Sequence, residues 1–76
     1  MKEFPRITHD PAVMGGQPCV RNMRATVGMI IRHLANGGTE PALLADYPYL
    51  EPGDIRESLA YAAWRLEARE FHLQAA

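Results

Sequence analysis

The sequence predicts one mainly α-helical domain, a three-helix body of helix-turn-helix type that follows a short hairpin-like pair of strands. Three segments have apolar residues at helical spacing, and each is bounded by capping residues, glycine or proline. The first 25 residues combine paired glycines, prolines and short β-prone runs, which favour strands and turns. A chain of 76 residues has the length of one domain. We divide residues 1–76 into short strands and turns (1–25), helices one and two (26–50) and a long third helix (51–74).

The strands are expected near the start of the chain. Residues 6–8 predict the first strand, and Asp10 with the proline after it ends that strand in a turn. Residues 11–14 are expected to form a single helical turn before the glycine pair. Residues 19–20, Cys-Val, predict the returning strand, and Asn22 is expected to turn the chain in the left-handed region. A two-strand unit this small needs the helices, or a second copy, for its stability.

Local signals at their ends define the first two helices. Thr26 is the expected N-cap of a helix over 27–36, which a glycine pair ends. Thr39 is the expected N-cap of a helix over 40–46. That helix ends there because Pro48 disfavours helical geometry in the residue before it.

The third helix is expected to begin at Pro52, with Asp54 reaching back towards Glu51 as in a capping box. A helix from Pro52 to Leu73 would be about 33 Å long, more than a domain of this size can cover. Two apolar stripes run along it: Ile55, Leu59, Ala62 and Leu66 form the first, and Tyr61, Trp64, Ala68 and Phe71 form the second. We expect the first stripe to pack on the other helices and the second to be a protein interface.

Composition restricts the location and the partners. The net charge is −1, with +3 over residues 1–38 and −4 over residues 39–76, so the two halves suit different partners. The lone Cys19 excludes an internal disulfide and predicts a reducing, cytoplasmic location. Residues 1–6 lack the apolar run of a signal peptide, and no segment has transmembrane length, so no membrane partner is expected.

No enzymatic site is expected. The three histidines are far apart, without ligand spacing, so neither a metal nor a cofactor is predicted. The only serine, Ser58, lies within a helix and has no triad partners. Cys19 is better explained as a small core residue than as a reactive thiol. A chain this short buries only about 60–65% of its unfolded surface, so a homodimer or higher homo-oligomer is expected.

Two groups of arginines have alternative interpretations. Arg6, Arg21 and Arg24 are candidates for a basic edge that contacts DNA phosphates or acidic groups of a partner, or are solvated turn arginines. Arg65 and Arg69 either meet carboxylates of a partner or form salt bridges at i,i+4 spacing on a solvated face.

A recognition helix that reads bases is disfavoured here. The start of the third helix is acidic, and it would repel a polyanion.

Two sequence frames resemble a known family. R-I-T-x-D-P-x-V-M-G-G-x-P-C-V-R with Arg24 (residues 6–24) and D-Y-P-x-L…D-I-R-x-x-L-A-Y-A (residues 46–62) are similar to the small bacterial domain of unknown function 433 family. This resemblance implies a homeodomain-like body and a VapB-like antitoxin of a type II toxin–antitoxin pair, with a PIN-like ribonuclease as the partner. The family often has Arg-Gly-Thr-Arg where this chain has Arg-Asn-Met-Arg at residues 21–24, and residues after 63 lie outside the shared pattern.

We therefore expect an antitoxin-like protein that binds and neutralises a PIN-like ribonuclease toxin. The expected partner-binding residues are Trp64, Arg65, Leu66, Arg69 and Phe71. One alternative is a DNA-binding transcription regulator of its own operator, with Arg6, Arg21 and Arg24 as the DNA-binding residues. The other is an orphan homo-oligomeric structural module.

Overall fold

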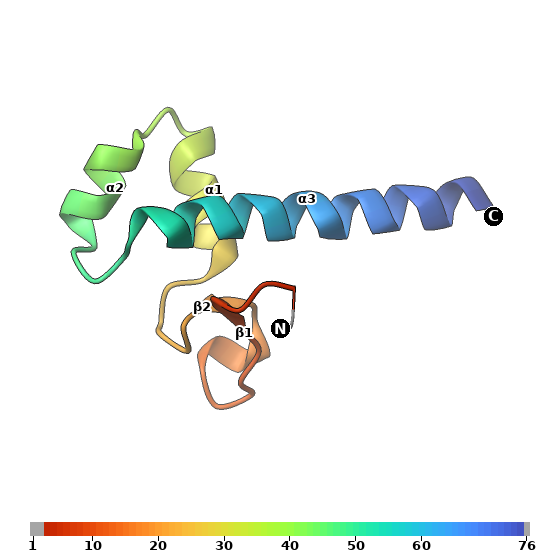
Figure 1. The fold of residues 1–76 in the computed structure, drawn as a ribbon, viewed down its shortest axis with the longest axis horizontal. Helices are drawn as coiled ribbons and strands as arrows, with labels where there is room; N and C mark the ends of the chain where they lie inside the picture. The colour runs from red at the N-terminus through yellow and green to blue at the C-terminus, as the bar shows by residue number, and fades with distance from the viewer. Residues whose placement is uncertain (1–2, 76) are drawn as a thin grey trace.

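Three helices follow a two-stranded antiparallel sheet in chain order (Figure 1). The computed structural model describes the backbone of residues 3–75 and the side chains of residues 3–68. The elements are β1 (Ile7–Thr8), a 3₁₀ turn (Met14–Gly16), β2 (Cys19–Val20), α1 (Val27–Ala35), α2 (Glu40–Asp46) and α3 (Pro52–Ala75). The predicted class, mainly α with a small N-terminal hairpin, is confirmed.

The sheet is the smallest possible, with Ile7 opposite Val20 and Thr8 opposite Cys19. The first strand begins one residue later than predicted. The predicted helical turn at 11–14 is wrong, because the 3₁₀ turn covers Met14–Gly16. Asp10 explains the shift. Its carboxylate accepts a hydrogen bond from the backbone N–H of Ala12 and its carbonyl accepts one from Val13, so an Asp-led turn forms first.

The turn after β2 uses the left-handed region twice. Asn22 has φ 58°, as predicted, and Arg21 has φ 46°, which was not predicted. The Asn22 N–H donates to the Thr8 hydroxyl, and the Met23 N–H donates to the Val20 carbonyl. These bonds hold the turn against β1 and so determine where the Arg21 side chain begins.

The predicted caps of the first two helices are confirmed. The Thr26 hydroxyl accepts from the Met29 N–H at 3.0 Å, and the Thr39 hydroxyl accepts from the Ala42 N–H at 3.2 Å. Helix α1 ends at Ala35, one residue before its expected end, and Gly37 follows in the left-handed region with φ 86°.

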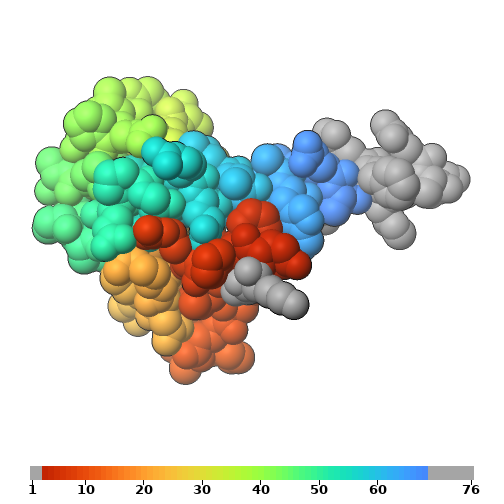
Figure 2. Space-filling view, viewed as in Figure 1, coloured from red at the N-terminus to blue at the C-terminus, as the bar shows by residue number. Residues whose placement is uncertain are grey.

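Helix α3 begins at Pro52 with the predicted reach-back, because the Asp54 carboxylate accepts from the Glu51 N–H at 2.8 Å. Its 24 residues make it about 36 Å long. Its C-terminal half extends beyond the other elements (Figure 1), and the space-filling view shows the helix leaving the body in the stretch before residue 69 (Figure 2).

Two clusters of buried side chains form the core. The first joins the three helices to β2 and comprises Val20, Ala25, Ile30, Leu43, Leu50 and Ile55. The second joins β1, α1 and α3 and comprises Ile7, Val27 and Tyr61, with Phe4, Ile31 and Ala62 packed against it. The second cluster therefore attaches the N-terminal segment to the middle of α3.

The face that α3 buries differs from the expected stripe. Leu59 is 42% exposed and Leu66 is 61% exposed, although both were expected to pack on the other helices. Tyr61 is only 2% exposed, although it was expected on the free stripe. Both assignments are wrong for these residues.

The buried face runs between the two predicted stripes. At about 100° per residue, its side chains lie within an arc of about 120° around the helix axis. They are Asp54, Ile55, Ser58 and Tyr61. Its centre line is polar, so an apolar periodicity cannot identify it. Leu59 lies about 40° outside this arc, and Leu66 lies where α3 has passed beyond the body.

Candidate functional site

Asp54 is the hub that attaches the N-terminal segment to the start of α3. Its side chain is fully buried, and it accepts from Arg21 Nη2 at 2.8 Å, Arg21 Nε at 3.1 Å and Arg6 Nη1 at 2.7 Å. Arg6 Nη1 also pairs with Glu51 at 2.7 Å, and Arg21 Nη2 donates to the Tyr49 carbonyl at 2.7 Å. One carboxylate therefore joins the strand region, the turn after β2 and the loop before α3.

The charges of this hub are strongly stabilised. Burial alone would raise the pKa of Asp54, but hydrogen bonds from Arg21, the Glu51 N–H and Arg6 outweigh it and hold that pKa below its ordinary value. The hydrogen bonds to Glu51 and Asp54 raise the pKa of Arg6. The cluster is therefore ionised at neutral pH.

The predicted basic edge is only partly free. The structure brings Arg6 and Arg21 together, but onto Asp54 instead of towards solvent. Each keeps only about a third of its side chain exposed, 35% and 36%. Arg24 is exposed and has no ion pair among the residues whose side chains the structure describes. A DNA phosphate at Arg6 or Arg21 would have to compete with a buried carboxylate.

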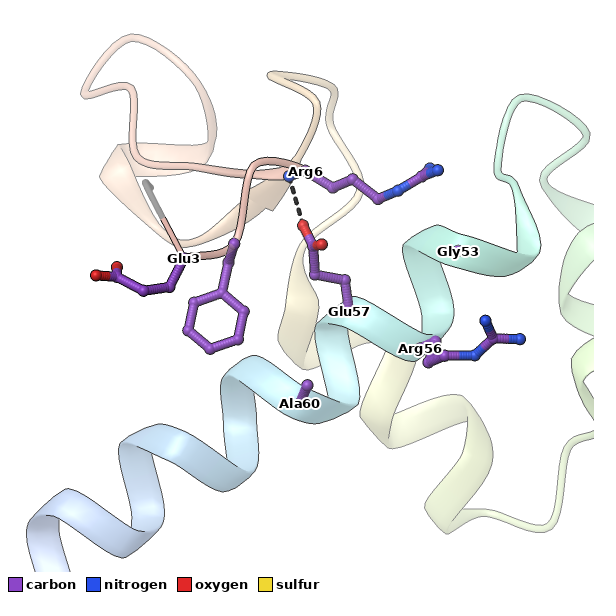
Figure 3. Close-up of a pocket in the computed structure, with 7 residues that line it drawn as sticks. Glu3, Arg6, Gly53, Arg56, Glu57 and Ala60 are labelled. Carbon is purple, nitrogen blue, oxygen red and sulfur yellow. Dashed lines mark hydrogen bonds between the residues drawn. The ribbon is translucent and has the colours of Figure 1, made fainter.

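A groove lies between the N-terminal segment and α3 (Figure 3). It has a volume of about 400 Å³ and is lined by Glu3, Phe4, Arg6, Gly53, Arg56, Glu57 and Ala60. Glu57 points from α3 to the segment and accepts from the Arg6 backbone N–H, whereas Arg56 points away from it. The Arg6 guanidinium passes so close to Gly53 that a Cβ there would lie 2.8 Å from Arg6 Cζ. A side chain at residue 53 would therefore force the Arg6 guanidinium to shift from the position in which it reaches Asp54.

Aromatic side chains continue the contact along α3. Phe4 packs edge-on against Tyr61, with ring centroids 5.4 Å apart, and lies 5.7 Å from Trp64. Trp64 is nevertheless 47% exposed. The body therefore ends at Trp64, with half of the indole facing solvent.

Arg65 is held next to this indole. Its Nη1 donates to the Tyr61 hydroxyl at 3.1 Å, and its guanidinium carbon lies 5.8 Å from the centre of the Tyr61 ring. Since arginine only donates, the Tyr61 oxygen accepts from it, and the same hydroxyl also hydrogen-bonds His9 Nε2 at 2.9 Å. Arg65 is thus anchored by an aromatic residue, and no described carboxylate pairs with it.

The expected partner-binding residues do not share one face. Trp64, Arg65 and Leu66 are exposed, but Trp64 and Leu66 point about 160° apart around the α3 axis at 100° per residue. The side chains of Arg69 and Phe71 lie outside the described residues. A flat partner surface can therefore contact either the Trp64 side or the Leu66 side of α3.

The described part of the chain shows no arrangement suited to a metal site, a membrane span or a reactive thiol. There, no three histidine, cysteine or acidic side chains gather in a way that would hold a metal ion. No described helix is both long enough and apolar enough to cross a bilayer. Cys19 is buried, as predicted, and burial raises the pKa of its thiol, which keeps it protonated.

The hub at Asp54 was not predicted from the sequence, which indicated only its capping role. A signal for it exists in the two sequence frames. Arg6 and Arg21 belong to the first frame, and Asp54 belongs to the second. Two arginines in one frame and a carboxylate in the other are residues of opposite charge, which could have indicated the pairing.

Comparison with known proteins gives one match. The family described as "Protein of unknown function (DUF433)" matches residues 7–62. The matched part includes Arg21, Asp54 and Tyr61 and ends before Trp64. Neither a curated protein nor a solved structure matches the chain.

Proposed function

This chain belongs to the DUF433 family of proteins of unknown function, and from that premise we propose that it is an antitoxin-like module that binds and neutralises a PIN-like ribonuclease. The observation that carries the proposal is the extension of α3 beyond the body. Among the residues whose side chains the structure describes, Tyr61 is the last that α3 buries, Ala62 is half-buried, and residues 63–68 are all exposed.

The extension has the composition of a binding segment. A helix of a dozen residues is only marginally stable in water without packing, so a partner that covers it supplies the missing stabilisation. Trp64 and Arg65 are adjacent on it, and these two residue types are enriched among the residues that dominate binding energy. We therefore assign the main anchoring contact to the indole of Trp64.

Arg65 supports the choice of an acidic partner site. The Tyr61 hydroxyl and ring hold its guanidinium, so less side-chain freedom is lost when it meets a carboxylate. Nucleases that use metal ions hold them with clustered carboxylates. A guanidinium inserted there would occupy the metal position, and the helix would block access of RNA. A cytoplasmic location is part of the same proposal.

DNA binding has no specific support at this site. Arg6 and Arg21 pair with Asp54, and the loop before α3 carries the exposed Glu51 beside them. These contacts leave Arg24 as the expected DNA-binding residue whose charge is not shared with a described carboxylate.

The test is co-expression with a PIN-like nuclease encoded beside this gene, followed by measurement of binding and of RNA cleavage. Trp64→Ala is expected to weaken binding by about tenfold or more, as for a central interface tryptophan. Arg65→Glu is expected to restore cleavage by repelling the nuclease carboxylates.

Tyr49→Ala is the matched control, since Tyr49 is also an aromatic residue about half exposed, at 45%, but lies at the opposite end of α3. Full inhibition by both Trp64→Ala and Arg65→Glu would reject the proposed surface. Failure of the wild-type chain to bind the nuclease would reject the proposed function.

A further inference from the structure

We infer that a second surface of α3, made of Leu59, Ala63 and Leu66, binds the same surface of another copy of this chain in an antiparallel helix pair. We call it the Leu59–Leu66 surface. Its three residues are spaced i, i+4 and i+7 and point within about 60° of one another around the helix axis. Leu59 and Leu66 are 42% and 61% exposed, and Ala63 is exposed as well.

The surface is distinct from the one assigned to the nuclease. Trp64 points about 160° away from Leu66 at 100° per residue. Phe4 and Tyr61 pack beside Trp64, so the N-terminal segment lies on that side. One flat partner on the Trp64 side leaves Leu59 and Leu66 in water. The inference therefore does not depend on the proposed function, and both surfaces can be occupied together.

The pattern of the surface is self-complementary. A two-fold axis near residue 62 places Leu59 beside Leu66 of the second copy, with an offset of about one residue, or 1.5 Å. Ala63 then lies next to the axis, where its small side chain lets the two helices approach closely.

The charges at the rim match the same axis. Arg56 and Glu67 are exposed, and they lie on one side of the surface about 20° apart around the helix. Neither forms an ion pair with a residue whose side chain the structure describes. The axis near residue 62 sets Arg56 beside Glu67 of the second copy, again with an offset of about one residue. Two symmetric ion pairs result, whereas in a parallel pairing this flank would face the opposite flank of the second copy and neither pair would form.

The antiparallel order also gives the extended half of α3 a packing surface. The first half of α3 packs on the body, and its second half extends beyond it (Figure 1). In an antiparallel pair, the extended half of each helix lies along the supported half of the other. A second copy of the chain thus covers what one copy leaves exposed, and opposed helix dipoles add a small favourable contribution.

The experiment is sedimentation velocity over a concentration series, with the full chain and no partner present. Wild type is expected to form dimers, and Leu66→Glu is expected to raise the dimer dissociation constant at least about tenfold. Since Leu66 is exposed, the variant is expected to keep its helix content and melting temperature at low protein concentration. Trp64→Ala, on the other side of α3, is the matched control and is expected to stay dimeric.

Charge reversal tests the order of the helices. Arg56→Glu and Glu67→Arg are each expected to weaken the dimer a few-fold, and the double variant is expected to restore it, because both pairs form again with exchanged signs. Ala63→Cys is expected to oxidise to a covalent dimer, whereas Ala60→Cys, about 60° further round the helix, is not. A monomeric wild type, a Leu66→Glu dimer of unchanged affinity, or equal cross-linking at both positions would overturn the inference.

Discussion

The guanidinium of Arg21 donates two hydrogen bonds to the carboxylate of Asp54, from Nη2 to Oδ2 at 2.8 Å and from Nε to Oδ1 at 3.1 Å. The two residues are 33 positions apart, and Asp54 is fully buried. Arg6 adds a second cation to the same carboxylate. This pairing makes the start of α3 depend on a turn near the beginning of the chain.

Removal of the charge at Asp54 should destabilise the whole fold. In Asp54→Asn the side chain keeps an oxygen for the Glu51 N–H, but Arg6 and Arg21 lose their shared anion. We expect a loss of about 2–3 kcal/mol in the free energy of unfolding, below the usual figure for a broken buried pair because both guanidiniums reach water. Urea unfolding followed by circular dichroism measures it.

The control for this variant is Asp46→Asn, at the exposed end of α2, which should change the free energy of unfolding by less than about 0.5 kcal/mol. Equal effects of the two substitutions would contradict a special role of Asp54.

The stability that Asp54 contributes to the fold should be lost at acidic pH. The pKa of Asp54 lies below its unfolded value because the hydrogen bonds from Arg21, Glu51 and Arg6 outweigh its burial. A depressed folded pKa contributes stability above the unfolded pKa, about 3.9, and loses it as the pH falls through the folded pKa. We therefore expect the difference in unfolding free energy between wild type and Asp54→Asn to be constant above about pH 5 and to shrink below about pH 4. Urea titrations from pH 2 to pH 7 check this, and a gap as large at pH 3 as at pH 6 would refute it.

The effect of Gly53→Ala on the free energy of unfolding should change sign when Arg6 is removed. Alanine is a better helix former than glycine by up to about 1 kcal/mol, but a Cβ at residue 53 lies 2.8 Å from Arg6 Cζ and Nη2. In the wild-type background, Gly53→Ala is expected to destabilise the fold, because Arg6 has to leave Asp54. In an Arg6→Ala background the same substitution is expected to stabilise it by a few tenths of a kcal/mol or more. A double-mutant cycle of unfolding free energies measures the coupling, and additive effects would argue against the packing of Arg6 over Gly53.

Ser58 lies fully buried on the centre line of α3, and its hydroxyl has no described hydrogen-bond partner. Ser58→Ala removes this polar group and improves helix propensity, so we expect stabilisation by about 0.5–1 kcal/mol. Ser58→Val, which adds volume to the closely packed face, is expected to destabilise the fold by about 1 kcal/mol or more. Thermal unfolding ranks the two variants, and a lower melting temperature for Ser58→Ala would indicate that the hydroxyl is hydrogen-bonded in solution.

Features that depend on a few neighbouring residues were predicted well. The caps at Thr26 and Thr39, the left-handed Asn22 and the reach-back of Asp54 each involve residues no more than three positions apart. Even among these local features, the turn led by Asp10 was not predicted to displace the helical turn. Asp10 captures the N–H of Ala12 in a turn and thereby moves the helical turn to Met14–Gly16.

The functional residues were predicted with mixed success. The closeness of Arg6 and Arg21 follows from the pairing of two short strands, and it was expected. Their common partner was not, because a contact 33 or 48 positions along the chain has no periodic signature. The partner-binding role of Trp64, Arg65 and Leu66 stays a prediction, now divided between two sides of α3.

The amino-acid sequence by itself determined where each of the three helices begins, and where it ends to within about two residues, since caps, glycines and prolines act within one helical turn. It also determined that α3 has more apolar surface than a single body can cover. Only the tertiary structure decided which line of α3 is buried. The two apolar stripes offered comparable hydrophobic gain, and the N-terminal segment settled the choice by docking Phe4 and Ile7 on Tyr61. That docking buries the polar line of Asp54 between the stripes, which is favourable only because two distant arginines neutralise its charge.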